Sequence, residues 1–250
     1  MKVIGPDWES TRALQGALTG VESEKVLKWG QGGLDGLEQL QKLNEANIPC
    51  PTYITQLVYA KALAKAGDVV WGRKRHHTQG KDIVPADYKL VEGRAAQEEL
   101  RWITTRKGNR VQRPRIVPAV AGGEHWNPKW LQSDFWVQFI PSVAEFRQHI
   151  FNGKAIRVGR KIQVDVALGG PLLVRSRRRG WHIQYQGVDA PEGLRTLAKE
   201  AVASLGYLFG AVDILQGVDG QLYVLEVNSA PALTDAGTLA AYVDAVKRWA

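Results

Sequence analysis

The feature that most constrains this chain is a pair of apolar, β-branched runs, residues 211–215 and 222–227, on either side of the dipeptide Asp219-Gly220. Asp-Gly between two such runs is a strong signal for a β-hairpin. The rest of both runs is apolar, which is typical of strands that other parts of a protein cover. We therefore expect a largely buried hairpin at the centre of the fold.

This hairpin would gather oxygen-bearing side chains on one face. Counting outward from a two-residue loop pairs Val218 with Gln221 and Asp213 with Glu226, and the alternation of side chains puts Asn228 on the face of Glu226. Opposed Cβ atoms lie about 5 Å apart, so the two carboxylates would repel by about 3 kcal/mol at an effective dielectric near 20. A divalent cation such as Mg²⁺, which prefers carboxylate and amide oxygens, would offset this cost. The alternative is a solvent-facing hairpin that happens to carry acids.

Length and composition place the chain among ordinary globular proteins. Its 250 residues suffice for one large domain or for two or three subdomains, with 44% hydrophobic and 23% charged residues. The single cysteine, Cys50, cannot form an internal disulfide. The first ten residues have no apolar core of signal-peptide length, and no run of about 18 apolar residues occurs in the sequence. We expect a soluble, cytoplasmic protein without a membrane partner.

The net charge of +8 favours anionic partners such as nucleotides, acidic peptides or nucleic acid. Residues 101–115 contain six basic residues and no acid, and a second cluster comprises Arg175, Arg177, Arg178 and Arg179. A strand through the second cluster would put Arg175, Arg177 and Arg179 on one face and Arg178 on the other. The alternative for both clusters is a solvated basic loop.

Periodicity and turn signals divide the remaining chain into helices and strands. A loop of small and polar residues, 77–81, follows a strand with a basic end (Arg73, Lys74), a pattern that suits the wrapping of phosphates by backbone N–H groups and cations. Helices are predicted over 10–18, 34–43, 55–65, 95–105, 194–205 and 239–249, and strands over 68–75, 135–140, 145–151, 155–166 and 175–186.

The motif Gly210-Ala-Val-Asp213, followed by Val224-Leu-Glu226-Val-Asn228-Ser-Ala-Pro231, resembles the signature of the ATP-grasp superfamily, specifically its glutamate-ligase-like carboxylate–amine ligases. Trp29-Gly30, His77-Thr-Gln-Gly80 and Glu145-Phe-Arg147-Gln-His149 resemble compact phage-encoded members, so that most of residues 26–250 are covered. The resemblance implies an α+β ATP-grasp fold with two α/β subdomains that clamp ATP. It divides the chain into a truncated N-terminal region (1–48), a lid subdomain ending in an adenine hinge (49–140) and a C-terminal subdomain with the magnesium site (141–250).

The same resemblance implies roles for individual residues. Asp213, Glu226 and Asn228 would hold one or two Mg²⁺ ions, and Arg147, Lys161 and Arg175 would contact the γ-phosphate and an acyl phosphate. The ATP-binding residues would be Arg73 or Lys74 at a phosphate, the lid loop His77, Thr78, Gln79, Gly80 and Lys81, and the hinge Val137, Gln138, Phe139 and Ile140.

The implied activity is ATP-dependent ligation of a small carboxylate and an amine, both of anionic character, into an amide or peptide bond. An acyl phosphate would be the intermediate, with ADP and phosphate released, and a phage-encoded protein would act in the host cytoplasm. The alternative is a nucleic-acid or polyanion-binding protein, which includes a ligase acting on a nucleotide or an acidic polymer.

Overall fold

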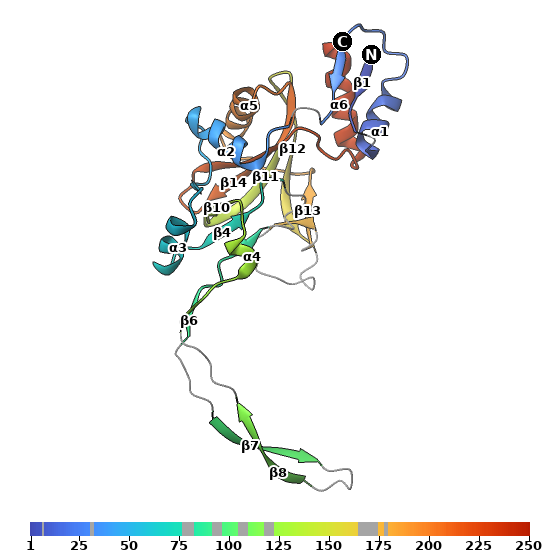
Figure 1. The fold of residues 1–250 in the computed structure, drawn as a ribbon. Helices are drawn as coiled ribbons and strands as arrows, with labels where there is room; N and C mark the ends of the chain where they lie inside the picture. The colour runs from blue at the N-terminus through green and yellow to red at the C-terminus, as the bar shows by residue number, and fades with distance from the viewer. Residues whose placement is uncertain are drawn as a thin grey trace.

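The computed structural model describes residues 1–6, 8–30, 33–76, 83–91, 97–104, 110–117, 123–164, 175–177 and 180–250. Its centre is a five-stranded antiparallel sheet (Figure 1). In spatial order the strands are β13 (Trp181–Gln184), β12 (Lys154–Gln163), β11 (Ser142–Phe151), β14 (Phe209–Gly217) and β15 (Leu222–Asn228). The strands predicted over 145–151 and 155–166 and the predicted hairpin are thus confirmed.

Helix α5 (Leu194–Ser204) covers one face of this sheet. Its apolar stripe, which includes Leu194, Ala198 and Val202, packs on the alternate residues Phe146 and Ile150 of β11. Because successive side chains of a strand point to opposite faces, the intervening residues of β11 are left to face the other side of the sheet. That other side carries the candidate site.

A second, four-stranded sheet is formed by β3 (Tyr53–Ile54), β10 (Phe135–Gln138), β4 (Val70–Arg73) and β5 (Val84–Pro85), in that order. Helix α2 (Gly36–Glu45) contributes Leu37 and Leu40 to a core with Trp71 and Phe135. Helices α3 (Leu57–Lys65) and α4 (Pro128–Leu131) form a further core with the same sheet. The predicted helices over 34–43 and 55–65 are confirmed.

The first and the last elements of the chain pack together. Strands β1 (Lys2–Ile4) and β2 (Val26–Lys28) pair in parallel, and helix α1 (Glu9–Ala17) lies against helix α6 (Ala236–Trp249) (Figure 1). Trp29 stacks on Phe209 at a ring distance of 4.6 Å and meets Tyr242 of α6 edge-on. Among the helices in the described ranges, none is both long and apolar enough to cross a membrane.

Residues 97–117 correct one prediction. The helix expected over 95–105 is strand β7 (Gln97–Thr104), which pairs antiparallel with β8 (Arg110–Val117). The Ala, Glu and Leu residues of this segment favour a helix, but Trp102, Ile103 and Thr104 favour a strand, and a β-branched partner strand decides between them. Strands β6 (Lys89–Val91) and β9 (Gly123–His125) pair at the base of this arm, which extends away from the two sheets (Figure 1).

The central hairpin corrects a second prediction while it confirms the pairing of Asp213 with Glu226. A two-residue loop would pair Gly217 with Leu222. In the structure Gln216 lies opposite Leu222, so the register near the turn differs by one residue from the predicted register. A β-bulge between Asp213 and Ile214 then inserts one extra residue in β15 and restores the expected pairing. The register shift at the turn and the bulge have opposite effects, and Asp213 therefore lies opposite Glu226 as predicted.

The third correction concerns the arginine cluster. The strand in this region is β13, which begins only at Trp181, so Arg175 and Arg177 precede it and do not alternate along a strand. Gly180, with φ +75°, turns the chain immediately before Trp181, a backbone conformation that glycine adopts without strain. Arg178 and Arg179 lie outside the described residues.

Candidate functional site

A cleft of about 800 Å³ lies between the two sheets. Its walls come from β4 and β10 on one side and from β11, β12, β14 and β15 on the other. The chain crosses from β10 to β11 through residues 139–141, so the predicted hinge residues Val137, Gln138, Phe139 and Ile140 connect the sheets and line the cleft. Trp71 and Ile83 add apolar surface beside them.

Strand register sets a row of charged side chains across the floor of the cleft. Arg147 of β11 lies opposite Asp213 of β14, and Asp213 lies opposite Glu226 of β15. Glu145 is two residues before Arg147 on the same face of β11 and meets Lys161 of β12. The sheet thus brings together residues that are far apart in the sequence.

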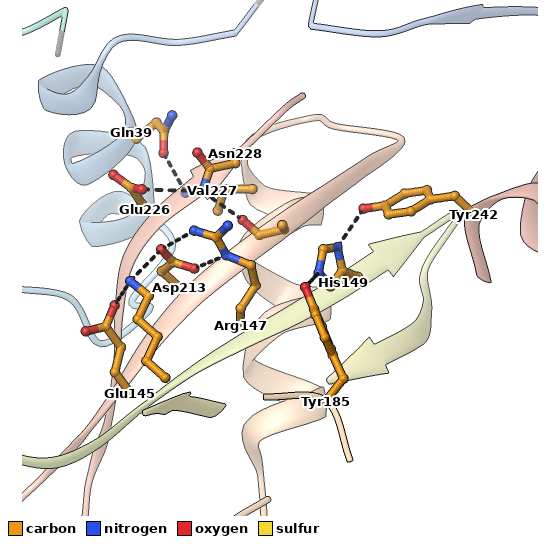
Figure 2. A network of polar contacts seen from close by, with 12 residues as sticks. Gln39, Glu145, Arg147, His149, Tyr185, Asp213, Glu226, Val227, Asn228 and Tyr242 are labelled. Carbon is orange, nitrogen blue, oxygen red and sulfur yellow. Dashed lines mark hydrogen bonds and ion pairs between the residues drawn. The ribbon is translucent and has the colours of Figure 1, made fainter. Parts of the chain in front are cut away.

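Asp213 is the centre of this row (Figure 2). Its two oxygens accept from Arg147 in a bidentate pair, Nε–Oδ1 at 2.6 Å and Nη2–Oδ2 at 2.7 Å. Lys161 Nζ donates to Oδ2 at 3.2 Å and also pairs with Glu145. With only 3% of Asp213 exposed, these charge-assisted bonds compensate the burial of its charge.

The pKa values of these groups follow their neighbours. Burial by itself would raise the pKa of Asp213, but Arg147 and Lys161 outweigh it and hold the pKa far below its ordinary value. Burial would likewise lower the pKa of Arg147 and of Lys161, and Asp213 raises both. Near neutral pH the row therefore contains a carboxylate between two fixed cations.

Glu226, at the end of this row, and Asn228 next to it are more open to solvent than Asp213. The side chain of Glu226 is 34% exposed, its Oε2 lies 3.7 Å from Arg73 Nη2, and its Oε1 accepts from Asn228 Nδ2 at 3.3 Å. Asn228 Oδ1, both carboxylates and water are the kinds of ligand that Mg²⁺ prefers, so the donor set fits this ion. Within the described ranges, no group of three or more His, Cys, Asp and Glu residues could hold a metal, so Asn228 would be needed as the third ligand.

The two candidate cations at the end of β4 are separated by the structure. Arg73, 9% exposed, lines the cleft and lies near Glu226. Lys74 instead donates to Asp134 at 3.1 Å and is not part of the cleft wall. The predicted lid residues His77, Thr78, Gln79, Gly80 and Lys81 lie outside the described residues.

Arg175 reaches the cleft from the segment before β13. Its Nη2 donates to the Ser142 carbonyl oxygen at 3.0 Å, and its guanidinium lies over the Trp181 ring at 5.3 Å. Its buried Nη1 has no hydrogen-bond partner among the residues that the structure describes. Arg175 thus lines the cleft with one buried donor nitrogen that no described group satisfies.

Sequence reasoning missed several residues of the site. Glu145 is 4% exposed and holds Lys161, and burial raises its pKa although Lys161 opposes that rise. Gln39 of α2 accepts from the Val227 N–H at 2.9 Å and so fixes β15 beside Glu226. Glu145 could have been identified, because it lies two residues before Arg147 and so shares its face of the strand. No feature of the sequence near Gln39 indicated its contact with β15.

A polar chain of rings continues beyond Arg147 (Figure 2). His149, 1% exposed, hydrogen-bonds through Nδ1 with the Tyr242 hydroxyl at 3.2 Å and through Nε2 with the Tyr185 hydroxyl at 3.3 Å. Burial, then the nearby Arg147, lowers the pKa of His149 to about 3. The imidazole is therefore neutral at physiological pH.

No family model and no curated protein matches the chain. Solved structures do match. D-alanine–D-alanine ligase from Bacillus anthracis has a TM-score of 0.54 at 10% identity, covering 99% of this chain and 96% of that one. The ATP-grasp ligase PsnB, complexed with a minimal precursor, Mg and ADP, has a TM-score of 0.52 at 13% identity, covering 95% of this chain and 66% of that one.

A third structure is the RiPP-associated ATP-grasp ligase from Chryseobacterium gregarium in complex with ADP and a leader and core peptide. It matches with a TM-score of 0.51 at 14% identity, covering 96% of this chain and 68% of that one. The chain therefore spans about two thirds of the length of both precursor-peptide ligases. At identities of 10–14% the similarity concerns the fold alone. The fold of this chain has two sheets with a cleft between them. This chain has the α+β ATP-grasp fold.

Proposed function

We propose that this protein is an ATP-dependent carboxylate–amine ligase that forms an amide bond through an acyl phosphate. The observation that carries the proposal is the row Arg147–Asp213–Glu226, with Lys161 beside it, on the floor of a cleft between the two sheets. Buried cations that flank carboxylates suit a polyphosphate with its metal ion, because both signs of charge have a partner there.

The nucleotide would lie along the cleft from the hinge toward this row. Adenine would contact the backbone of Val137–Ile140. Its ring would lie between Trp71 of the four-stranded sheet and Leu215 of the five-stranded sheet, and all of these residues line the cleft. The phosphates would then reach Arg73 and Lys161, with residues 77–81 as the lid. The division of the chain at residues 48 and 140 stays a prediction.

The magnesium site is part of the same proposal. Asp213, Glu226 and Asn228 would hold the ion, because their register and spacing place two carboxylates and an amide on one sheet face. When bound, Mg²⁺ neutralises phosphate charge and orients the transferred group. Lys161 and Arg147 would then exchange part of their bonding to Asp213 for phosphate oxygens.

The chemistry would proceed in two steps. A carboxylate oxygen of the substrate attacks the γ-phosphorus, the bond to the β–γ bridging oxygen breaks, and ADP leaves. An amine then attacks the acyl carbon, the carbon–oxygen bond to phosphate breaks, and the amine proton passes to water. Arg147, Lys161 and Arg175 would stabilise charge on the transferred phosphoryl group, and the protein need not supply a nucleophile.

The proposal can be tested with the full chain, ATP and Mg²⁺ against a panel of amino acids, peptides and nucleotides. ADP release and the mass of the products would be measured. For any active pair, a carboxylate labelled with ¹⁸O should transfer one label to inorganic phosphate, since that oxygen attacks phosphorus. Product formation without transfer of the label would contradict the acyl phosphate.

A second candidate, binding of a polyanion, is supported by the composition of the arm. β7 and β8 pair in the segment where the sequence holds six basic residues and no acid between positions 101 and 115, a composition that favours binding of an anion. Nucleic acid would supply such an anion, and its binding should weaken steeply with salt.

A further inference from the structure

Beyond Arg147 the floor of the cleft loses its charge. The next residue on the same face of β11 is His149, whose Nε2 hydrogen-bonds with the Tyr185 hydroxyl (Figure 2). Tyr185 lines the cleft, and His149 is not among the lining residues. The low pKa of His149 keeps this ring neutral. This part of the cleft therefore presents the neutral pair of Tyr185 and His149, in contrast to the cations Arg147 and Lys161 of the charged row.

Gly159 makes this arrangement of Tyr185 sterically allowed. A Cβ at position 159 would lie 2.4 Å from Ile183 Cγ2 and 2.9 Å from two atoms of the Tyr185 ring. Because β12 carries no side chain here, the ring lies over the strand opposite Arg147. The position of the Tyr185 ring thus depends on the absence of a side chain at Gly159 of β12.

Asp235 is a charged residue of the cleft wall. Its Oδ1 accepts two hydrogen bonds, from the Thr238 N–H at 2.7 Å and the Thr238 hydroxyl at 2.8 Å, and forms an ion pair with Arg157 Nη2 at 2.8 Å. Oδ2 accepts none from the residues that the structure describes, and 43% of the side chain is exposed. Asp235 lines the cleft and is held through Oδ1, with Oδ2 left without a described donor.

The counter-ion of Asp235 is Arg157, which packs on a cleft residue without lining the cleft itself. Arg157 lies over the Tyr185 ring at 4.4 Å, pairs with Oδ1 and is not among the residues that line the cleft. Partial burial raises the pKa of Asp235, but the Thr238 and Arg157 donors outweigh it and hold the pKa below its ordinary value. Asp235 is therefore ionised at neutral pH.

The remaining walls at this end are aromatic or small. Trp8, 48% exposed, lines the cleft, and its ring lies close to Gly30, where an added Cβ would be 2.9 Å from Cζ3. Ala230, Ala232 and Thr234 also line the cleft. Aromatic faces beside a carboxylate favour an ammonium group with apolar carbons, because the ring quadrupole and the charge both attract a cation.

We propose that this end of the cleft, formed by Trp8, Tyr185, Thr234 and Asp235, binds the acceptor amine as an ammonium ion and that Asp235 determines specificity for it. This inference rests on the proposed ligase function and adds the chemical class of one substrate, an alkyl or aralkyl ammonium. Asp235 recognises the charge and does not take part in bond formation. The bound ammonium gives one proton to water before its nitrogen attacks the acyl carbon, and a second proton passes to water as the amide forms.

The test uses calorimetric titration of the full-length protein at pH 7.5 with three probes of similar shape: benzylammonium, benzyl alcohol and phenylacetate. Benzylammonium should bind most tightly. Asp235→Asn should weaken it by roughly tenfold, because an ion pair is lost while asparagine still caps α6. The weaker binding of benzyl alcohol should change less than twofold.

Asp35→Asn is the matched control. Asp35 also caps a helix, α2, and pairs with an arginine, Arg75, at 3.0 Å, but it does not line this cleft. Equal effects of the two substitutions on benzylammonium, or tighter binding of phenylacetate, would overturn the proposal. A parallel titration with ADP tests the nucleotide site, so failure of the ligase function would be seen separately.

Discussion

At the scale of single residues, the bonding of Asp213 limits how a metal can enter. A carboxylate has about four lone-pair positions, and Arg147 and Lys161 use three of them. A bare divalent ion at Asp213 would also lie close to two cations and be repelled by them. We therefore expect the metal to bind together with the nucleotide, whose phosphates give Arg147 and Lys161 new partners.

Glu226→Gln tests the metal assignment. The variant keeps the size of the side chain but loses the charge of a proposed ligand, so ATP turnover should fall by at least about 100-fold. Mn²⁺ binding with ADP, followed by electron paramagnetic resonance, should weaken in parallel, while circular dichroism stays unchanged. Glu192→Gln, on the exposed surface before α5, is the control. Wild-type turnover in Glu226→Gln would remove Glu226 from the metal site.

His149 predicts a loss of stability in mild acid. Its pKa is about 3 when folded against an ordinary 6.5, so the unfolded chain binds more protons between these values and stability falls as pH decreases through this window. The loss between pH 7 and pH 5 should be about 2 kcal/mol. Urea unfolding at the two pH values measures this loss. The loss should be absent from His149→Gln and should remain in His182→Gln, which changes an exposed histidine. Equal losses in all three proteins would contradict the assignment.

At the scale of elements, sequence periodicity predicts most of what lies in the two sheets. The apolar spacing of α2 and α5 and the alternation of β11 are visible in the chain itself. The bulge in β15 and the strand β7 could not be predicted, because each depends on a partner strand. Asp213 and Glu226 were identified from the hairpin, whereas the bonds from Arg147 and Lys161 to Asp213 require the assembled sheet.

Gly159→Ala tests the packing of β12 against Tyr185. The added methyl group would overlap Ile183 and the tyrosine ring, so we expect a loss of about 1–3 kcal/mol in the free energy of unfolding. Gly16→Ala in α1 is the control, since no atom lies within 4 Å of its added Cβ, and it should gain about 0.5–1 kcal/mol. Urea unfolding measures both. A neutral Gly159→Ala would mean that the ring does not lie over β12.

At the scale of the whole molecule, the arm formed by β7 and β8 is separate from the two sheets (Figure 1). These strands pair with each other, and β6 and β9 at the base pair Val91 with Gly123. The body of the protein should therefore fold without the arm. The basic residues of 101–115 would then serve a partner and not the core.

Replacing residues 92–122 by Asn-Gly tests this separation, because a two-residue turn suits the antiparallel pairing of Val91 with Gly123. The melting temperature and ADP binding should stay close to those of the intact chain. If the arm binds polyanions, the salt dependence of binding to heparin should become shallower in the shortened protein. An unchanged slope would exclude the arm as the polyanion site, and unfolding would show that it supports the body.

The packing of the first elements against α6 has a consequence for the order in which the protein can be made. Leu14, Leu27 and Trp29 belong to the same buried cluster as Tyr242 and Val246, and Ser23 Oγ donates to the Ala250 carbonyl oxygen at 3.2 Å. A ribosome synthesises the first group long before the second. Until α6 has left the exit tunnel, these apolar side chains lack the Tyr242 and Val246 surface that completes their cluster, and exposed apolar surface of this kind is what makes a nascent chain depend on chaperones.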